Sequence, residues 1–164
     1  PLSPLATVGT TPLEDVGYIG EDGVSLELGQ EVKNIRQGNP SLIEYSFYQQ
    51  QSATITFTSI EWDFAQLSKA VGATYTIGSP GTFGFGGKAL ATLVGIKIEH
   101  QMAVTGNTMN IFCYRAQSES SMAIQFNQDE HQFPFTFNAL RATQNFAGIA
   151  LNADSCLVEF ERLF

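Results

Sequence analysis

Charge is scarce in this sequence, and basic charge most of all. Only 15% of the 164 residues are charged, and 8 Lys and Arg stand against 16 Asp and Glu, which gives a formal net charge of -8. Proteins that grip nucleic-acid phosphates do so with clustered basic side chains. The balance therefore argues against a phosphate-gripping surface, although not against a surface that nucleic acid passes without binding. A large surface hidden in an assembly would explain why the charged fraction falls below the about 25% of an average domain.

Cysteine and long apolar runs are scarce as well. Cys113 and Cys156 are too few and too far apart for a metal-ligand pattern or a disulfide framework. No apolar run approaches the about 20 residues of a membrane-spanning helix. The first residues do not combine a basic segment with an apolar one, so we expect no secretory signal, no membrane insertion by this chain and synthesis in the cytoplasm.

Residues with catalytic chemistry are few. His100 lies within an apolar alternation, which favours a buried histidine, and His131 follows two acidic residues in a charged turn. The glycine-rich loop 78–88 has Thr82 and Ala89 where a phosphate-binding loop requires glycine and then Ser or Thr. We therefore expect no catalytic residue, no metal and no cofactor.

What the sequence does contain is alternation of apolar and polar residues, which indicates strands. The cleanest run is 24–32; turn-forming residues at 37–41 and a second run at 41–51 follow it. In this second run Ile43, Tyr45 and Phe47 oppose Leu42, Glu44, Ser46 and Tyr48, so both faces are partly apolar and we expect both to be covered. Further strand-like runs lie at 53–58, 93–104, 109–116, 121–127, 133–137 and 156–160.

Local signals refine this pattern at three places. A turn at 105–107 predicts a hairpin between the runs on either side of it. Pro134 places its run at a sheet edge or a strand start, because proline has no N–H to donate. Apolar residues at helical spacing, with Thr58 and Glu61 in the spacing of a capping box and Gly72 as a stop, predict a helix over about residues 59–71.

These elements predict a mainly β domain, an antiparallel β-sandwich or barrel with one flanking helix. We expect this single domain to span 14–164, after an extended arm at 1–13 that contains three prolines. Six acidic residues and no basic ones lie between Glu14 and Glu31. Charge is absent from three long windows at 45–60, 70–87 and 100–114, which suit surfaces that meet another polar surface.

Four segments in this order carry a resemblance to a known family. They are the acidic strand 22–28, the run 53–58 that follows a hairpin rich in Gln, Ser and Tyr, the helical segment 61–67, and the run 133–140 that precedes the last strands. The order of elements resembles the major tail tube proteins of long-tailed, siphovirus-like bacteriophages.

The resemblance implies a subunit that forms hexameric rings, which stack into a tube through which double-stranded DNA leaves the virion. Its partners would be copies of itself and the tail tip, terminator and tape measure proteins, with DNA passing without specific binding. It would be assembled in the host cytoplasm and reside in the virion tail. The acidic balance agrees with this role, because it repels phosphates from the bore.

Two sets of residues are our site hypotheses. The hairpin from Lys33 to Gln51 is expected to reach a neighbouring subunit or ring, because a turn-rich tip joins its strands. The candidate contact residues are Arg36, Gly38, Asn39, Pro40, Ser41 and Tyr48. Glu27 and Glu44 face away from apolar strand faces and are the candidates for an acidic lumen.

Two other functions remain open from the sequence. One is a lectin-like β-sandwich in which Trp62, Tyr75 and Phe83 or Phe85 stack on sugar rings. The other is a different virion ring protein, a tail terminator or a capsid-decoration protein, which would form closed rings or trimers but no filament.

Overall fold

The structure, a computed structural model, consists mainly of β-strands. It describes residues 2–6, 13, 15–38, 41–60, 64–87, 92–101, 107–119 and 132–163, with the backbone alone for residues 2–6 and Ala70. In chain order the elements are β1 (Leu2–Ala6), β2 (Ile19–Gln37), β3 (Leu42–Ser59), α1 (Phe64–Val71), β4 (Thr74–Thr76), β5 (Thr82–Gly84), β6 (Leu93–Gln101), β7 (Thr108–Ser118), β8 (Phe133–Ala139), the 3-10 turn η1 (Ala153–Ser155) and β9 (Glu159–Leu163).

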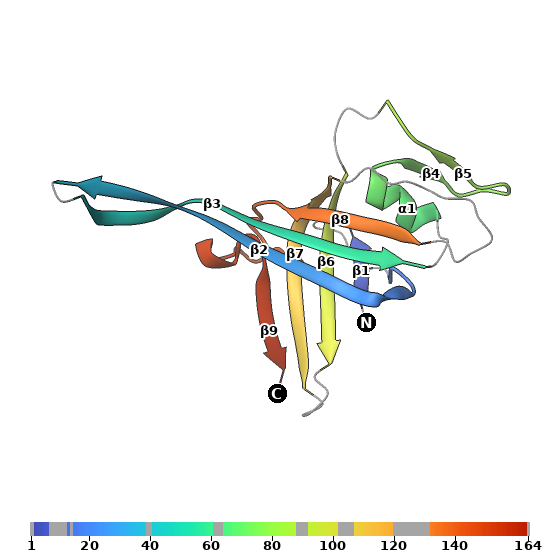
Figure 1. The fold of residues 1–164 in the computed structure, drawn as a ribbon. Coiled ribbons are helices and arrows are strands. Elements are labelled where there is room, and N and C mark those ends of the chain that lie inside the picture. The colour runs from blue at the N-terminus through green and yellow to red at the C-terminus, as the bar shows by residue number, and fades with distance from the viewer. Residues whose placement is uncertain are drawn as a thin grey trace.

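One antiparallel sheet contains most of these strands (Figure 1). Its order is β1-β6-β7-β8-β3-β2, and β9 pairs with β7 beside this path, while β4 and β5 form a separate small sheet. β1 and β2 end the described sheet on its two sides, so the sheet is open. The prediction of a mainly β, antiparallel fold with one helix is confirmed.

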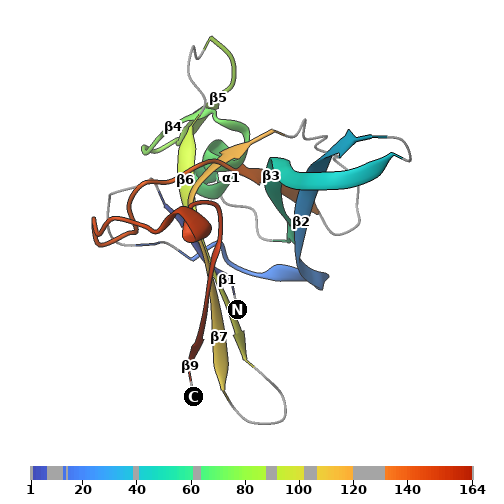
Figure 2. The same cartoon turned by 90° about the vertical axis from the view of Figure 1, so that its left-hand side faces the viewer.

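The sheet changes direction where β7 meets β8. The residues 108–112 of β7 pair with β9, and only its last three residues, 116–118, pair with β8. β2, β3 and β8 consequently run across β6, β7 and β9, as Figures 1 and 2 show. The core lies between these two halves and includes Ile55 and Phe137 from one half and Ile96 and Cys113 from the other.

Phenylalanines of β3 and β8 form the centre of this core. The ring of Phe57 lies 4.9 Å from that of Phe135 and 6.1 Å from that of Phe137, centroid to centroid. Pro134, which precedes Phe135, is exposed and pairs with β3 alone, at the start of β8. Its expected place at a strand start is therefore confirmed.

The helix begins later than the sequence pattern predicts. Thr58 and Ser59 belong to β3, and Ile60 lies outside the helix, so the predicted start at residue 59 is wrong. Ser59 pairs with Ile19 on one side and Phe133 on the other, and these ladders extend the strand through the expected cap. Glu61 of the expected capping box lies outside the described residues. Gly72 ends the helix as predicted, with φ +65°.

Other strand predictions have mixed outcomes. The runs 41–51 and 53–58 form one continuous strand, β3, and the expected hairpin is formed by β6 and β7, although its turn residues 105 and 106 lie outside the described residues. The run 121–127 and His131 also lie outside them. His100 is exposed rather than buried, because it lies near the end of β6, beyond the core. Residues 2–6 of the expected arm pair with β6 as strand β1.

Candidate functional site: the β2–β3 hairpin

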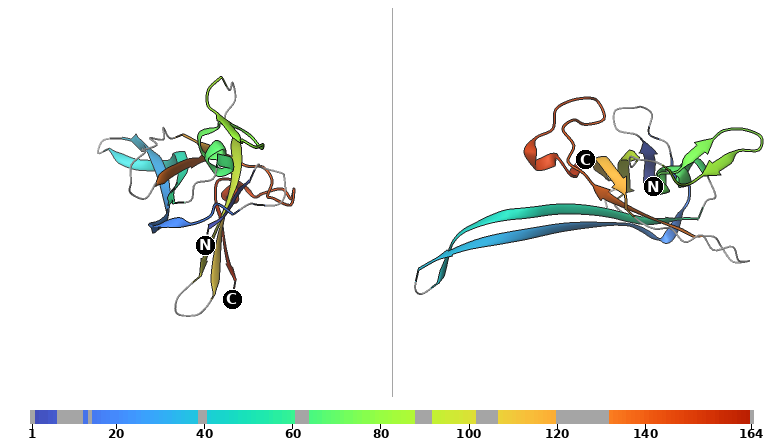
Figure 3. Two further views of the ribbon diagram at one scale, coloured as in Figure 1. Left: turned by 90° about the vertical axis from the view of Figure 1, so that its right-hand side faces the viewer. Right: turned by 90° about the horizontal axis from the view of Figure 1, so that it is seen from above.

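The hairpin of β2 and β3 reaches far beyond the rest of the protein. Its pairs run from Ile19 with Ser59 to Gln37 with Leu42, whereas β8 accompanies β3 only from Thr54 to Ser59. Figure 1 and the right panel of Figure 3 show the outer part extending away from every other element. We call residues 24–31 and 50–57 the stem, and residues 32–37 and 42–48 the tip. Among the described residues, the tip has no strand on either of its edges.

The inner part of the stem has one buried face and one polar face, and Leu28, farther out on the buried side, is 57% exposed. Ile55 and Phe57 belong to the core, whereas Thr54 and Thr56 lie on the opposite face, paired with Glu27 and Ser25 of β2. The Thr54 hydroxyl donates to Asn138 Oδ1 of β8 at 2.9 Å. This outward face is polar, and among its described residues Glu27 and Glu31 supply the only charges.

From the stem outward, the register of the hairpin shifts twice, once where the stem meets the tip and once within the tip. Glu31 pairs with Gln50 but Val32 pairs with Tyr48, so Gln49 has no partner in the ladder, and Glu44 is skipped in the same way between Ile43 and Tyr45. An extra residue of this kind in one strand reverses the alternation of the residues that follow. The expectation that Ile43, Tyr45 and Phe47 share a face is therefore wrong for Ile43.

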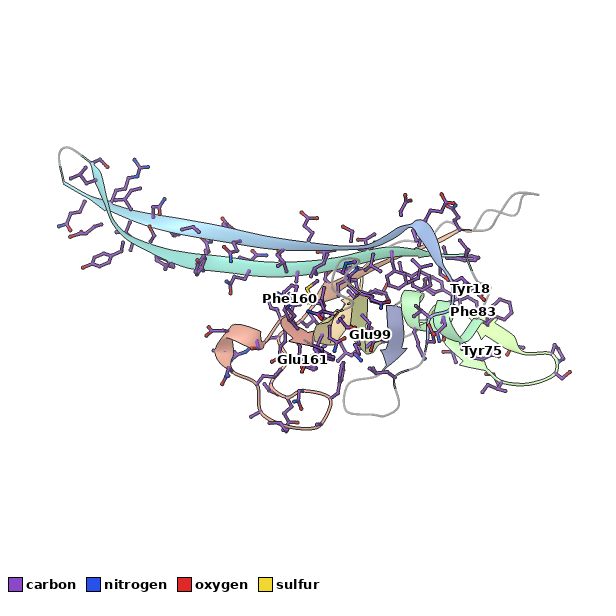
Figure 4. The ribbon with its side chains drawn as sticks, turned by 90° about the horizontal axis from the view of Figure 1, so that it is seen from below. Tyr18, Tyr75, Phe83, Glu99, Phe160 and Glu161 are labelled. Carbon is purple, nitrogen blue, oxygen red and sulfur yellow. The ribbon has the colours of Figure 1, made fainter. Side chains whose placement is uncertain are left out.

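Because residues paired across an antiparallel ladder lie on the same face, the pairs define two faces of the tip. The core-side face continues the buried face of the stem, and the outer face continues its polar face. The core-side face contains the pairs Val32–Tyr48, Asn34–Ser46 and Arg36–Ile43; the outer face contains Lys33–Phe47, Ile35–Tyr45 and Gln37–Leu42. Tyr48 is 62% exposed and Tyr45 66% exposed. Large apolar side chains thus face solvent on both sides, as Figure 4 illustrates for the hairpin as a whole.

The structure places the predicted contact residues at or near this tip. Arg36 and Tyr48 are on its core-side face, and Gly38 and Ser41 lie at the turn, whereas Asn39 and Pro40 are outside the described residues. Further residues of the tip were not among the predicted contacts. They are Val32, Ile35, Leu42, Ile43, Tyr45 and Phe47. Their apolar character was the signal in the sequence that could have identified them as contact residues. They are exposed because no other described element packs on the tip.

The two acidic lumen candidates lie in different places. Glu27 is exposed on the outward face of the stem, on the same side as Glu31. Glu44 is the skipped residue of the tip, toward the far end of the hairpin. The Glu44 carboxylate lies beside the side-chain amide of Gln37, a residue of the outer face, so Glu27 and Glu44 are separated along the hairpin, one in the stem and one in the tip.

The tip is also the basic part of the hairpin. Segment 32–48 contains Lys33, Arg36 and Glu44, so its net charge is +1. Because the whole chain has a net charge of -8, the rest of the chain has a net charge of -9. Neither Lys33 nor Arg36 has an ion-pair partner among the described residues. One basic side chain accompanies the apolar residues of each face, Arg36 on the core-side face and Lys33 on the outer face.

The aromatic residues considered for sugar binding mostly pack within the protein. Tyr75 and Phe83 are paired across β4 and β5, and their rings lie 6.5 and 5.9 Å from that of Phe64 on α1. Tyr18, Tyr75 and Phe83 gather at the end of the body away from the hairpin tip (Figure 4). Phe85 is 77% exposed, and Trp62 lies outside the described residues. Tyr75 and Phe83 thus attach the small sheet to the helix.

A polar row crosses β6, β7 and β9. Asn110 pairs with Glu99 on one side and Glu161 on the other, and its Nδ2 donates to Glu161 Oε2 at 3.1 Å. Lys97 forms an ion pair with Glu99, two residues along the same strand. Glu99 and Glu161 are labelled in Figure 4. Across the described residues, no three His, Cys, Asp or Glu side chains are arranged to hold a metal ion.

The shifted pKa values belong to structural groups of β7. Burial, and next the Glu159 carboxylate that accepts a hydrogen bond from the Tyr114 hydroxyl, raise the pKa of Tyr114 well above its usual value. Burial raises the pKa of the Cys113 thiol to about 11. Both changes favour the neutral form, so neither group is prepared to act as a nucleophile or base near neutral pH.

Two comparisons with known proteins identify no relative of this chain. No protein-family model matches the chain, and no curated protein matches it. Within the part of the chain that the structure describes, no helix is both long enough and apolar enough to cross a membrane. The functional argument therefore rests on the hairpin and on the charge distribution.

Proposed function

We propose that this protein is a structural subunit that polymerises into stacked rings and forms a tube like those built by the major tail tube proteins of long-tailed bacteriophages. One observation carries the proposal: the tip of the β2–β3 hairpin extends beyond the body with large apolar side chains exposed on both faces. A free subunit leaves these side chains in water, and an assembly covers them.

The exposed apolar surface is large enough to support association. Seven large apolar residues of the tip are exposed, namely Val32, Ile35, Leu42, Ile43, Tyr45, Phe47 and Tyr48. Full burial of such a side chain contributes roughly 1.5–3 kcal/mol. The set therefore contributes on the order of 10 kcal/mol, comparable with the about 4–15 kcal/mol that association costs in lost freedom. Strand pairing along the open edges of the hairpin would add to it.

The shape of the hairpin favours repeated rather than paired association. The tip lies far from the body and differs from it in charge, so the natural contact joins the tip of one copy to the body of another. A contact between two different surfaces leaves both surfaces open on the resulting dimer. Such contacts close into rings or continue as filaments.

The outward face of the stem is our candidate for the wall of the bore. It presents Glu27 and Glu31 among Thr, Ser and Gln side chains. Acidic charge repels DNA phosphates, so DNA can move past without being held. Glu27 fits this role better than Glu44, because Glu44 belongs to the tip, which the proposal places between subunits.

The remaining partners follow from the position of such a tube in a virion. DNA and a tape measure protein would occupy the bore, and tail tip and terminator proteins would cover the two ends. The subunits would assemble in the host cytoplasm and remain in the virion tail. The proposal requires no cofactor, metal or catalytic residue.

Negative-stain electron microscopy of the purified protein at high concentration tests the proposal. We expect tubes of uniform width built from stacked rings. Single rings that never stack would contradict it in favour of a terminator or decoration protein. Monodisperse monomers that bind members of a glycan panel would contradict it in favour of the lectin-like alternative.

A further inference from the structure

The two faces of the hairpin tip share the same kinds of residue. Each face carries apolar side chains and one basic residue, with Ile43, Tyr48 and Arg36 on the core-side face and Tyr45, Phe47 and Lys33 on the outer face. A hairpin that lies flat on one partner buries one face and leaves the other in solvent. In that arrangement the solvent face is expected to be polar, as it is in the stem.

We propose that each tip is held between two other copies of this chain, one on each face; this inference rests on the proposed function. Regular alternation in the unbroken run 45–48 of β3 puts large apolar side chains on both faces. The skip at Gln49 assigns Tyr48 to the core-side face and Tyr45 and Phe47 to the outer face, and the skip at Glu44 adds Ile43 to the core-side face and Leu42 to the outer face. Each subunit therefore joins at least two others through its hairpin alone.

Charge complementarity identifies the occupants as copies of this chain. The tip segment carries +1, and the remainder of every other copy carries -9. Lys33 and Arg36, which have no ion-pair partner among the described residues, each provide a cation for one acidic neighbour. Docking on both faces consequently joins a basic, apolar tip to two acidic bodies.

Photocrosslinking from the two faces tests this arrangement. A benzophenone amino acid replaces Tyr48, Tyr45 or both, and a small fraction of labelled chain is assembled with excess unlabelled chain. We expect two-chain adducts from each single variant and three-chain adducts from the double variant. Peptide mapping is expected to place the two crosslinks in two different partner chains.

The outcomes separate this inference from the proposed function. If tubes form but only one position yields adducts, or if the double variant never exceeds two chains, two-sided docking is wrong while the tube remains. If no multimer forms and neither position yields adducts, both proposals are wrong. Three-chain adducts from small oligomers without tubes would support two-sided docking and contradict the tube.

Charge reversal provides a second test, with circular dichroism to establish folding. Arg36→Glu and Lys33→Glu each change one face, and we expect each to raise the critical concentration for assembly at least tenfold. Arg141→Glu, an exposed basic residue of the body, is the matched control for net charge. An effect from only one of the two tip variants, or an equal effect from the control, would overturn the inference.

Discussion

Ile55 and Ile43 are the same residue type on the same strand and on the same side of the β2–β3 ladder, but their surroundings are opposite. Ile55 in the stem is 0% exposed, and Ile43 in the tip is 53% exposed. Strand β8 and the rest of the core cover the first, whereas no described element covers the second. The comparison separates two uses of apolar side chains: the stem stabilises the fold, and the tip remains available for assembly.

Removal of the tip is the change with the largest expected effect. Residues 32–49 are replaced by Asn-Gly, which joins the paired residues Glu31 and Gln50 by a two-residue turn. We expect a folded body with nearly unchanged thermal stability and complete loss of tubes in electron microscopy. Unfolding of this variant, or normal tubes from it, would contradict the division between stem and tip.

Matched substitutions of the two isoleucines come next. Ile55→Ala is expected to lower the free energy of unfolding by about 2–5 kcal/mol, because it leaves a cavity in the core. Ile43→Ala is expected to change it by no more than about 0.5 kcal/mol but to weaken assembly. Urea unfolding measures the first quantity and sedimentation of assembled protein the second. Equal effects on unfolding would show that the tip is part of the folding core.

Gly95→Ala perturbs the body away from the hairpin. A Cβ at this position would overlap Cε1 of Phe146, whose ring also packs edge-on against Tyr114 with 4.8 Å between the ring centroids. Displacing the ring is expected to cost about 1–3 kcal/mol in the free energy of unfolding. Near-UV circular dichroism should change as well, while assembly of the folded fraction stays intact. Loss of assembly without loss of stability would place this surface at a subunit contact.

Tyr114→Phe has the smallest expected effect. It removes the hydrogen bond from the Tyr114 hydroxyl to Glu159, at a cost of about 1 kcal/mol near neutral pH. Folding raises the pKa of Tyr114 above its unfolded value of about 10. This contribution is therefore complete below about pH 10 and is lost as the pH rises above it.

Unfolding measured against pH checks the sign. The stability difference between Tyr114→Phe and the parent protein should shrink above about pH 10. Tyr75→Phe is the matched control, because its ring packs on Phe64 and has no hydrogen bond to a carboxylate among the described residues. A stability difference that stays constant across the whole pH range would show that folding does not raise the pKa of Tyr114.

Local pattern predicted much of this fold, and long-range pairing decided the rest. Alternation at 24–32 and 133–137 identified strands correctly; Val24 and Leu26 of the first run and the phenylalanines of the second pack in or against the core. Helical spacing after Thr58 predicted the helix too early, since the ladders with Ile19 and Phe133 extend β3 through Ser59. The position of β8 between β3 and β7 depends on contacts that no local pattern encodes.

The candidate site was predicted in position but not in detail. Turn residues at 37–41 located the hairpin, and apolar residues on both sides led to the expectation that both faces are covered, whereas in the single subunit both faces of the tip are exposed. The skipped residues Gln49 and Glu44 could not be predicted, because polar residues in an alternating run fit either a regular strand or a register shift. Their positions decide which face Tyr45 and Tyr48 occupy, and this required the structure.

The same skipped residues also limit what a free subunit can do before it meets its partners. A long strand with an open edge is a template for uncontrolled strand addition and fibril growth. The regular ladder is interrupted at Gln49 and again at Glu44, so the longest unbroken run of pairs in the tip covers only residues 32–35 of β2. Short runs of this kind are poor seeds for a fibril. The interruptions therefore lower the risk of fibril growth while the hairpin is exposed, before the assembly that we propose covers it.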